Sequence, residues 1–374
     1  MAQNKSRKKR ILQICGIGTG GIETLVINMI QDLKGEYDFE MYTNTPKNHT
    51  NRIKLEQMTV KINYYDKIPE SKAGYVFHLI KHLNTNHYDI LHSHSLFSSG
   101  INLFAAWLNG VPIRIAHAHN SHAEVCNTIK RKIYVSLMKL MIRIFSTDMI
   151  AVSEEAAKFV FGSKSLKSKK TKVIPNGINL DEFNRDLYHP YAAFKEFGLN
   201  PYDVHFVTVA RFAYEKNHYF LIDIFLELSK KITDAHLTLV GDGELRTDVE
   251  EYVIEKGLKE KVTFTGNRND IPSILSAMDY FLLPSRGEGF GIVFIEAQAM
   301  GLYCFASDTV PKSVNMGNIS FIPLECTPYQ WASQIEEIYF NHETREIRPE
   351  HLEHFNIKST ESKIARIYNR EAGV

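Results

Sequence analysis

One stretch in the second half of the chain combines glycine, carboxylates and a helix start in a way that suits a phosphorylated ligand. A helix is expected to open on Gly289-Phe290-Gly291, directly after an apolar strand and a short loop. The free N–H groups at a helix start favour an anion, and glycine lets a ligand approach the backbone. Glu288 and Glu296 flank this opening, where each can accept hydrogen bonds from hydroxyl groups. Phosphate in the middle and hydroxyls at both ends describe a sugar nucleotide, which points to glycosyl transfer.

Two cations lie near the carboxyl end of an earlier strand. Arg211 ends an apolar run, and Lys216 follows at the next helix start. Arginine offers a bidentate fork and lysine a mobile point charge, so the pair could neutralise a diphosphate leaving group. Glycine or cation also follows two further strands, at Gly241 and at Asn267-Arg268. Each feature alone is more often structural, but four such strand ends are hard to explain by packing alone, and together they predict phosphate binding.

The two glutamates do not suit a glycosidase. Eight helical residues advance about 12 Å. A retaining hydrolase needs its carboxyl groups about 5–5.5 Å apart, and an inverting one at most about 9.5 Å. The spacing of Glu288 and Glu296 therefore favours contacts at two ends of one ligand over hydrolysis.

A glycine-rich loop also follows the first strand. Gly16, Gly18 and Gly21 match G-x-G-x-x-G between a strand and a helix, which is the fingerprint of a dinucleotide site. An NAD site also needs an acid at the end of the second strand, but the nearest acid, Glu40, falls inside that strand. No Walker loop is present, because no Gly-Lys-Ser/Thr follows. An anion-binding backbone nest is favoured over a plain tight turn, and an NAD-dependent enzyme remains an open alternative.

Histidines gather at the ends of two successive strands of the first half. Several imidazoles close together could hold zinc, or they could be hydrogen-bonded turn residues. No cysteines or carboxylates alternate with them, so no metal is expected. His94 is interpreted as a residue of the ligand cleft, with its role as base or orienting group open. The histidines concerned are His92, His94, His117, His119 and His122.

Composition excludes several classes of protein. The 374 residues are 44% hydrophobic and 23% charged, and 44 basic against 43 acidic residues leave a formal net charge of +1. A globally basic nucleic-acid binder is therefore not expected. The four scattered cysteines fit a reducing cytoplasm. No signal-peptide core and no apolar run of about 18 residues occur, so a cytoplasmic protein without a membrane span is expected.

Short β-branched or apolar runs alternate with helix-period segments along the whole chain. This alternation predicts an α/β protein with parallel sheets, and thirteen strands fit two sheets better than one. Open parallel sheets bind ligands at the carboxyl ends of their strands, so the cleft between two Rossmann-like domains is the expected site. The strands are expected at 11–15, 39–43, 60–64, 89–92, 113–117, 149–152, 172–174, 205–210, 237–240, 262–265, 280–283, 303–306 and 319–322.

Together these residues resemble the retaining glycosyltransferases of the GT-B fold, the group 1 or family 4 set that includes bacterial exopolysaccharide and capsule enzymes. The resemblance covers almost the whole chain and is most specific at the two glutamates, at the two cations, and at Pro175–Ile178. It implies two facing Rossmann-like domains with a deep cleft, and a last helix that crosses back to the first domain. The corresponding boundaries are 1–180 for the acceptor domain, 190–355 for the donor domain and 356–374 for the crossing helix.

The resemblance also implies roles for single residues. Arg211 and Lys216 would hold the donor diphosphate, assisted by the amides of residues 289–291. Glu296 would accept hydrogen bonds from the ribose, and Glu288 would contact the donor sugar near its 3- and 4-hydroxyls. His94 would lie beside that sugar. The further donor-side residues are Gly20, Gly21, Gly241, Asn267 and Arg268, and the acceptor-side residues are His117 and His119.

The expected reaction moves a hexose or N-acetylhexosamine from a nucleotide diphosphate sugar, UDP-linked by preference, with retention of the anomeric configuration. No side chain is an obvious covalent nucleophile, so the resemblance implies front-face attack. No metal or other cofactor is expected, because cations and amides can carry the diphosphate charge and no D-x-D element occurs. Many relatives carry Phe or Tyr where this chain has Gly287, which leaves the donor sugar open.

The segment 129–145 bears on the acceptor. It mixes five cations with many apolar residues, so it could lie on the inner face of a membrane that carries a lipid-linked acceptor. It could equally be a packed helix of the first domain, which is slightly favoured because a strand follows at Met149. A glycan or lipid-linked acceptor and peripheral membrane contact are expected, and nucleic acid is not.

Three alternatives from other classes remain open at this stage. They are an NAD-dependent oxidoreductase, a nucleotide-sugar epimerase, and a non-catalytic subunit that binds sugar nucleotides.

Overall fold

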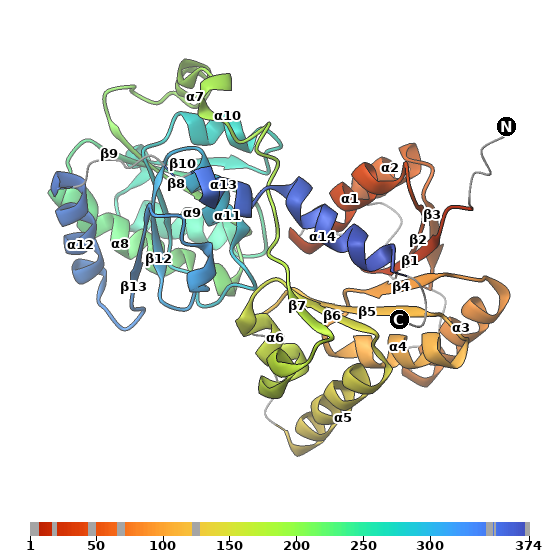
Figure 1. The fold of residues 1–374 in the computed structure, drawn as a ribbon. Coiled ribbons are helices and arrows are strands. Elements are labelled where there is room, and N and C mark those ends of the chain that lie inside the picture. Colours follow the sequence, from red (N-terminus) through yellow and green to blue (C-terminus); the bar gives the residue numbers. More distant parts are fainter. Residues whose placement is uncertain are drawn as a thin grey trace, which may run out of the picture. The chain divides into compact units, whose positions relative to one another are not determined.

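The computed structural model describes residues 7–16, 21–43, 50–65, 72–121, 128–341, 347 and 349–370 of the chain. The chain divides into two compact units (Figure 1). Unit 1 comprises residues 1–176 and 360–374, and unit 2 comprises residues 177–359. The chain thus leaves unit 1 after Asn176 and returns to it at Thr360.

Unit 1 is built on a seven-stranded parallel sheet with the order β3-β2-β1-β4-β5-β6-β7. Its first strand lies inside the sheet, so the order reverses between β1 and β4. The strands are β1 (Arg10–Ile14), β2 (Asp38–Thr43), β3 (Lys61–Tyr64), β4 (Ile90–Ser93), β5 (Ile113–Ala118), β6 (Asp148–Ala151) and β7 (Thr171–Val173). The α-helices are α1 (Gly21–Leu33), α2 (Thr50–Gln57), α3 (Lys72–Thr85), α4 (Ser99–Leu108), α5 (Ile129–Phe145) and α6 (Glu154–Phe161).

Unit 2 repeats this plan with six parallel strands in the order β10-β9-β8-β11-β12-β13. Here the order reverses between β8 and β11. The strands are β8 (Val204–Val209), β9 (Ala235–Val240), β10 (Val262–Gly266), β11 (Tyr280–Leu283), β12 (Tyr303–Ser307) and β13 (Ile319–Ile322). The α-helices are α7 (Pro190–Phe197), α8 (His218–Lys231), α9 (Arg246–Glu255), α10 (Ile271–Ser276), α11 (Ile292–Ala299), α12 (Pro328–Asn341) and α13 (Pro349–His354), and α14 (Ile357–Tyr368) follows.

The predicted α/β architecture is confirmed, and all thirteen strands lie within two residues of their expected bounds. The strands are short and apolar because helices cover parallel sheets and bury them on both faces. In unit 2, Phe206 and Phe305 of the sheet and Trp331 of α12 share one core cluster, and all three are fully buried. None of the described helices is long and apolar enough to cross a membrane.

The end of α14 is anchored in unit 1, where it lies beside α1 (Figure 1). Tyr368 is fully buried, and its ring makes an edge contact with Tyr37 at 5.3 Å between centroids. Its hydroxyl lies 2.7 Å from His92 Nδ1 and accepts a hydrogen bond of 3.1 Å from Gln13 Nε2. The last turn of the chain therefore packs against the carboxyl ends of β1 and β4.

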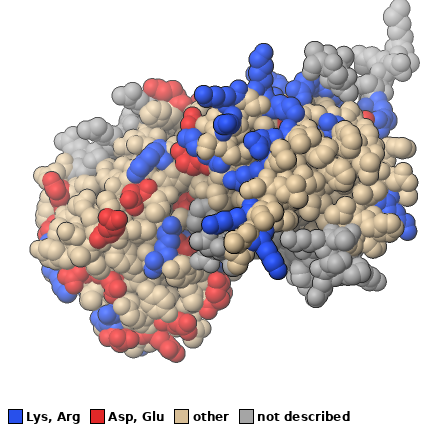
Figure 2. Space-filling view, turned by 90° about the horizontal axis from the view of Figure 1, so that it is seen from below, with Lys and Arg blue, Asp and Glu red and all other residues tan. Residues whose placement is uncertain are grey.

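The two units carry large and opposite charges. Unit 1 has 28 basic and 15 acidic residues, a formal charge of +13, whereas unit 2 has 16 basic and 28 acidic residues, a charge of −12. Figure 2 shows Lys and Arg gathered over one part of the surface and Asp and Glu over another. The net charge of +1 for the whole chain conceals this separation.

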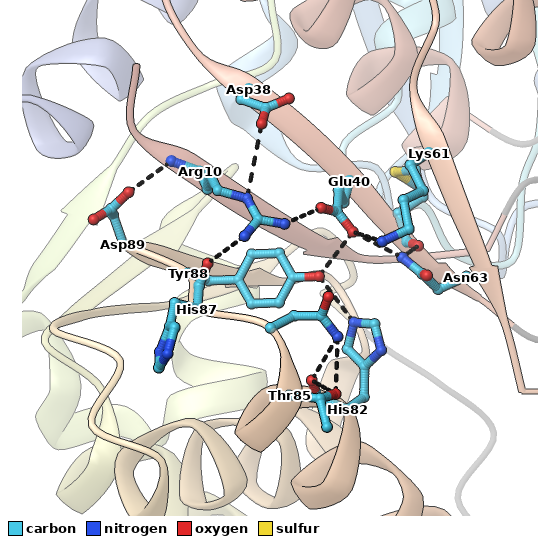
Figure 3. A network of polar contacts seen from close by, with 12 residues as sticks. Arg10, Asp38, Glu40, Lys61, Asn63, His82, Thr85, His87, Tyr88 and Asp89 are labelled. Carbon is cyan, nitrogen blue, oxygen red and sulfur yellow. Dashed lines mark hydrogen bonds and ion pairs between the residues drawn. The ribbon is translucent and has the colours of Figure 1, made fainter. Parts of the chain in front are cut away.

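Glu40 in β2 is the centre of a buried polar network in unit 1 (Figure 3). It is 5% exposed and pairs with Arg10, Tyr88 Oη at 2.8 Å, Asn63 Nδ2 at 3.1 Å and Lys61 Nζ at 3.2 Å. Burial opposes ionisation of the carboxyl group, but the hydrogen bonds outweigh it and lower the pKa of Glu40 to about 2. The nearest acid to the glycine loop is thus committed to the interior of the fold and does not end its strand.

We expect Glu40→Gln to lower the free energy of unfolding by about 2 kcal/mol at pH 7, because it leaves buried donors without their anion. The lowered pKa means that this contribution is present above the carboxyl's usual value and is lost as the pH falls from about 5 toward 2. Urea unfolding of both proteins at several pH values measures it. Glu154→Gln, which breaks an exposed pair with Lys158, should change little. Equal stability of wild type and Glu40→Gln at pH 7 would contradict the assignment.

Candidate active site

The two reversals of strand order gather the predicted site residues. Ligands of open parallel sheets bind where neighbouring crossovers run in opposite directions. In unit 2 the loops after β8 and β11 meet at that point, and they carry the two cations and the first glutamate. In unit 1 the order reverses between β1 and β4, and His92 and His94 lie at the end of β4. The predicted site residues thus lie at the strand ends where the order of the sheet reverses.

Lys216 and Glu288 form a tight ion pair at the reversal in unit 2. Lys216 Nζ lies 2.7 Å from Glu288 Oε1 and 2.8 Å from Oε2. Ser285 Oγ donates a third hydrogen bond of 2.7 Å to Oε1. Glu288 is 7% exposed, so its carboxylate would be costly without these donors. The structure thus brings together the two residues that the sequence assigned to the diphosphate and to the sugar.

The loops that carry this pair are joined to each other. The Arg286 N–H donates a 2.7 Å hydrogen bond to the Glu215 carbonyl, and the Arg286 guanidinium lies 4.6 Å from the centroid of the Tyr214 ring. Asn217 adopts a left-handed conformation, with φ of 59°, and its Nδ2 donates to the Pro284 carbonyl at 3.1 Å.

Sequence reasoning did not single out Ser285, Arg286 or Asn217 as site residues. Their only signal was their place next to Lys216 and Glu288 in the same loops.

Arg211 differs from Lys216 in having no side-chain partner. Its side chain is exposed, and no ion pair or side-chain hydrogen bond joins it to another residue of the described ranges. Arginine retains its charge at any ordinary pH. The guanidinium is therefore available to an anionic ligand.

Helix α11 (Ile292–Ala299) follows directly after the Gly289-Phe290-Gly291 opening. It begins at Ile292, with Gly291 as its N-cap in the left-handed region at φ 83°, where glycine carries no steric cost. Gly289 and Phe290 precede the helix, and Phe290 is 4% exposed. The three residues Gly289, Phe290 and Gly291 thus lead into the helix, and the helical segment begins at Ile292 as the sequence pattern indicated.

Glu296 lies inside α11 and is half-buried. Unlike Glu288, it forms no ion pair with any residue that the structure describes. Burial raises the pKa of Glu296 to about 7. A carboxyl group in this state changes its charge near neutral pH, and a perturbed group of this kind is typical of a functional site.

Close packing explains Gly241, which was expected to mark phosphate binding, and also Gly243 two residues later. A Cβ atom on Gly241 would lie 2.1 Å from the Ala210 carbonyl oxygen, and one on Gly243 would lie 2.5 Å from that of Phe212. The loop after β9 passes so close to the residues that follow β8 that these two positions leave no room for a Cβ atom and require glycine. Gly241 therefore has a packing role of its own, and its expected donor role stays a prediction.

Arg268 is neutralised by two carboxylates. Its guanidinium lies 2.6 Å from Glu196 and 2.7 Å from Asp270. Hydrogen bonds to these two acids raise its pKa. Asn267 beside it is exposed. A donor role for Arg268 stays a prediction and would require these ion pairs to break.

The glycine loop of unit 1 falls largely outside the described residues. Gly18 and Gly20 are among those left undescribed, and Gly21 is the first residue of α1. His122 also lies outside the described ranges. The predicted anion nest therefore stays a prediction.

Four histidine rings stack on one face of the unit 1 sheet. His92 and His94 come from the end of β4, and His117 and His119 from the end of β5. None is more than 8% exposed, and neighbouring ring centroids are 4.0–5.2 Å apart. Burial lowers the pKa of His94 and of His117 well below the usual value, and that of His92 and of His119 to about 3. The rings are therefore neutral at physiological pH.

Gln13 in β1 determines how two of these rings carry their protons. Its Nε2 donates to Tyr368, so its Oε1, which can only accept, faces His94 Nε2 at 2.9 Å. His94 is thus protonated on Nε2, and its Nδ1 accepts from His119 Nε2 at 2.8 Å. His119 Nδ1 is left as a buried lone pair without a partner in the described part of the chain. The chain of hydrogen bonds leaves a fixed acceptor at the end of β5, which sequence reasoning did not foresee.

The same rings have the geometry of a loose metal site. One nitrogen each from His92, His94 and His117 lies within 4.8 Å of the others. However, His92 Nε2 lies 3.2 Å from His117 Nδ1, in hydrogen-bond contact. Both nitrogens of His94 are also engaged. An ion would have to replace these contacts, so the geometry does not favour a metal over the hydrogen-bonded arrangement.

Comparison with known proteins identifies the chemistry. The family model "Glycosyltransferase Family 4" matches residues 19–182, and the model "Glycosyl transferases group 1" matches residues 203–341. The chain is a glycosyltransferase of the GT-B fold. The NAD-dependent oxidoreductase, the epimerase and the non-catalytic subunit are not favoured by any of these matches.

Relatives of this glycosyltransferase cover most of its length. It is 29% identical to EpsF of Bacillus subtilis over 84% of the chain and 83% of EpsF. It is also 29% identical to the capsular polysaccharide biosynthesis glycosyltransferase CapH of Staphylococcus aureus, over 93% of the chain and 95% of CapH. An Escherichia coli UDP-Gal:α-D-GlcNAc-diphosphoundecaprenol α-1,3-galactosyltransferase is 33% identical over 62% of the chain and 60% of that protein.

Among solved structures, the glycosyltransferase is similar to Anabaena HepE in complex with UDP. The TM-score is 0.78 at 18% identity, and the match covers 96% of this chain and 99% of HepE. At this level of identity the likeness concerns the fold.

The proton positions of the histidine cluster lead to a spectroscopic prediction. Nitrogen-15 NMR of the histidine side chains should show His94 and His119 protonated on Nε2 and neutral from pH 8 down to pH 5, because burial disfavours the imidazolium. In Gln13→Leu the Nε2 preference of His94 should weaken, since its acceptor is gone. A His94 signal that titrates between pH 6 and pH 7 in the wild type would show that the ring is not held in this way.

Proposed function

We propose that this glycosyltransferase transfers a hexose or N-acetylhexosamine from a UDP-linked donor to a glycan or lipid-linked acceptor, with retention of configuration, in cell-surface polysaccharide biosynthesis. The observation that carries the proposal is the Lys216–Glu288 ion pair at the reversal of the unit 2 sheet. Arg211 lies in the same loop after β8 as Lys216, and its side chain forms no ion pair within the described residues. The two cations at this edge of the sheet could bind an anionic group of the ligand, and the carboxylate could accept hydrogen bonds from hydroxyl groups next to it.

The relatives support the donor and the pathway. The Escherichia coli relative uses UDP-Gal and a diphosphoundecaprenol-linked acceptor by its name, and CapH acts in capsular polysaccharide biosynthesis. HepE binds UDP. A UDP-sugar and a lipid-linked or growing glycan are accordingly the substrates that we propose for this chain, at the inner face of the membrane where such acceptors would be met.

In the proposed reaction, the acceptor hydroxyl oxygen bonds to the anomeric carbon while the bond from that carbon to the diphosphate oxygen breaks. The bonding electrons leave with the diphosphate, which also takes the hydroxyl proton. Lys216 would shift from Glu288 to the departing diphosphate, joined by Arg211 and by the start of α11. Glu288 would then be free to accept hydrogen bonds from the donor sugar.

We propose that this charge compensation works without a metal. Arg211 and Lys216 together carry two positive charges, which matches the charge of a nucleotide diphosphate ester. In unit 1, His94 would orient the donor sugar, while His117 and the free lone pair of His119 would accept hydrogen bonds from the acceptor.

Replacing Lys216 by Gln should lower kcat for UDP release by about a hundredfold, because the leaving group loses a cation while Glu288 keeps a hydrogen-bond donor. Lys216→Arg should retain part of the activity. The matched control is Lys259→Gln, which removes a lysine elsewhere in unit 2 and should leave kcat unchanged. Wild-type turnover in Lys216→Gln would contradict the role of this lysine.

Glu296 provides a pH-dependent test of donor binding. A thermal-shift panel of UDP-, GDP- and ADP-sugars should show stabilisation of the wild type by a UDP-sugar. Since the pKa of Glu296 is raised to about 7, its carboxylate is the minor form at pH 6 and the major form at pH 8. Donor affinity should therefore rise about tenfold over this range.

Glu296→Gln should bind the donor with no such rise, and Glu296→Ala should be stabilised less than the wild type. If no nucleotide sugar stabilises the wild type, the proposed transferase reaction is wrong. If Glu296→Ala is stabilised equally, only the ribose role of Glu296 is wrong.

A further inference from the structure

Helix α5 is apolar on two opposite faces. Met138 and Ile142 are buried against the rest of unit 1. Five other apolar side chains of the same helix are largely exposed, which is unusual for residues of this size. They are Ile129 (77%), Ile133 (64%), Leu137 (51%), Leu140 (45%) and Ile144 (57%). We call these five residues the α5 stripe.

The α5 stripe is narrow and continuous. At about 3.6 residues per turn, its five side chains fall within an arc of about 80°, on the side of the helix opposite Met138 and Ile142. A helix of 17 residues carries this stripe over about 25 Å. The helix is therefore packed, as the sequence favoured, and it also presents a second apolar face that the described chain leaves uncovered.

Basic residues border the stripe. Lys130, Lys132 and Arg143 of α5 are exposed, and residues 129–145 contain no Asp or Glu. Lys170 donates to the Arg143 carbonyl at 3.4 Å and to the Ser146 carbonyl at 2.8 Å. This contact holds the lysine-rich segment that follows α6 against the end of α5, and the exposed lysines of that segment are Lys164, Lys167 and Lys169.

An aromatic residue extends the same end of the helix. Trp107 of α4 is 50% exposed, and its ring centroid lies 5.1 Å from that of Phe145. Tryptophan prefers the boundary between water and hydrocarbon.

We propose that the α5 stripe docks on an anionic phospholipid bilayer, with α5 lying in the plane of the interface. A basic amphipathic helix binds such a surface because its apolar side chains enter the acyl boundary while its cations meet the headgroups. The formal charge of +13 on unit 1 adds long-range attraction to an anionic surface.

The positive charge around the α5 stripe favours an anionic bilayer over a second copy of the chain as its partner. Two α5 surfaces brought face to face would place cations opposite cations, which opposes association. Nucleic acid would satisfy the cations but not the apolar stripe. Membrane docking rests on the proposed function, which places the acceptor at a membrane. Vesicle binding requires no turnover, so a failure to bind vesicles can be distinguished from a failure of the proposed reaction.

The test is co-sedimentation of the full chain with vesicles of phosphatidylcholine alone and of phosphatidylcholine mixed with phosphatidylglycerol. One variant, Ile133→Ser with Leu137→Ser, removes apolar area from the stripe. A second, Lys130→Gln with Lys132→Gln and Arg143→Gln, removes charge. The control pair, Ile254→Ser and Phe340→Ser, removes exposed apolar side chains (59% and 69%) from unit 2. All replaced side chains are exposed, so thermal unfolding of each variant should match that of the wild type.

The wild type should bind the anionic vesicles and not the neutral ones. Binding should weaken about tenfold in the apolar variant and at least as much in the charge variant, with only the charge variant losing its sensitivity to salt. The control variants should bind like the wild type. The proposal is overturned if the wild type ignores anionic vesicles or if both stripe variants bind unchanged. It is also overturned if light scattering shows a dimer that separates in the apolar variant, because the occupant would then be a second copy.

Discussion

In both units the first strand lies inside the sheet, because the crossovers run first to one side of it and then to the other. The order reverses between β1 and β4, and again between β8 and β11, and ligands of open parallel sheets bind at the carboxyl ends of strands at such a point. Lys216 and Glu288 follow β8 and β11, and His92 and His94 lie at the end of β4. The reversal of strand order is thus the constraint on which the geometry of both sites depends.

Hydrogen-bond donors and cations close to a buried carboxyl group determine whether it is charged at neutral pH. Glu40 receives four donors, and its pKa falls to about 2 in spite of burial. Within the described residues, no cation pairs with Glu296, and burial raises its pKa to about 7. Burial likewise disfavours the charged form of the four histidines of unit 1, and no acid of the described residues pairs with them.

The same contrast applies to the surface. The chain as a whole is almost neutral, yet one unit is strongly basic and the other strongly acidic. The donor site that we propose lies in the acidic unit, where Arg211 and Lys216 would supply the local positive charge that a diphosphate requires. The basic unit carries a helix that satisfies its own core with one face and exposes the α5 stripe with the other. The acidic unit thus contains a local pair of cations, whereas the basic unit combines its positive charge with an exposed apolar helix face.

The sequence by itself determined the alternation of strands and helices, because buried parallel strands must be short and apolar and the helices between them must be amphipathic. It also indicated Lys216, Glu288 and Glu296, since chemistry-bearing residues at strand ends are visible as a pattern. Only the tertiary structure decided that Lys216 bonds to Glu288, that packing demands Gly241, and that Gln13 and Tyr368 orient the protons of the histidines. These depend on contacts between segments as many as 355 residues apart. The α5 stripe also needed the structure, because a helical pattern shows that apolar faces exist but only packing shows which of them remains uncovered.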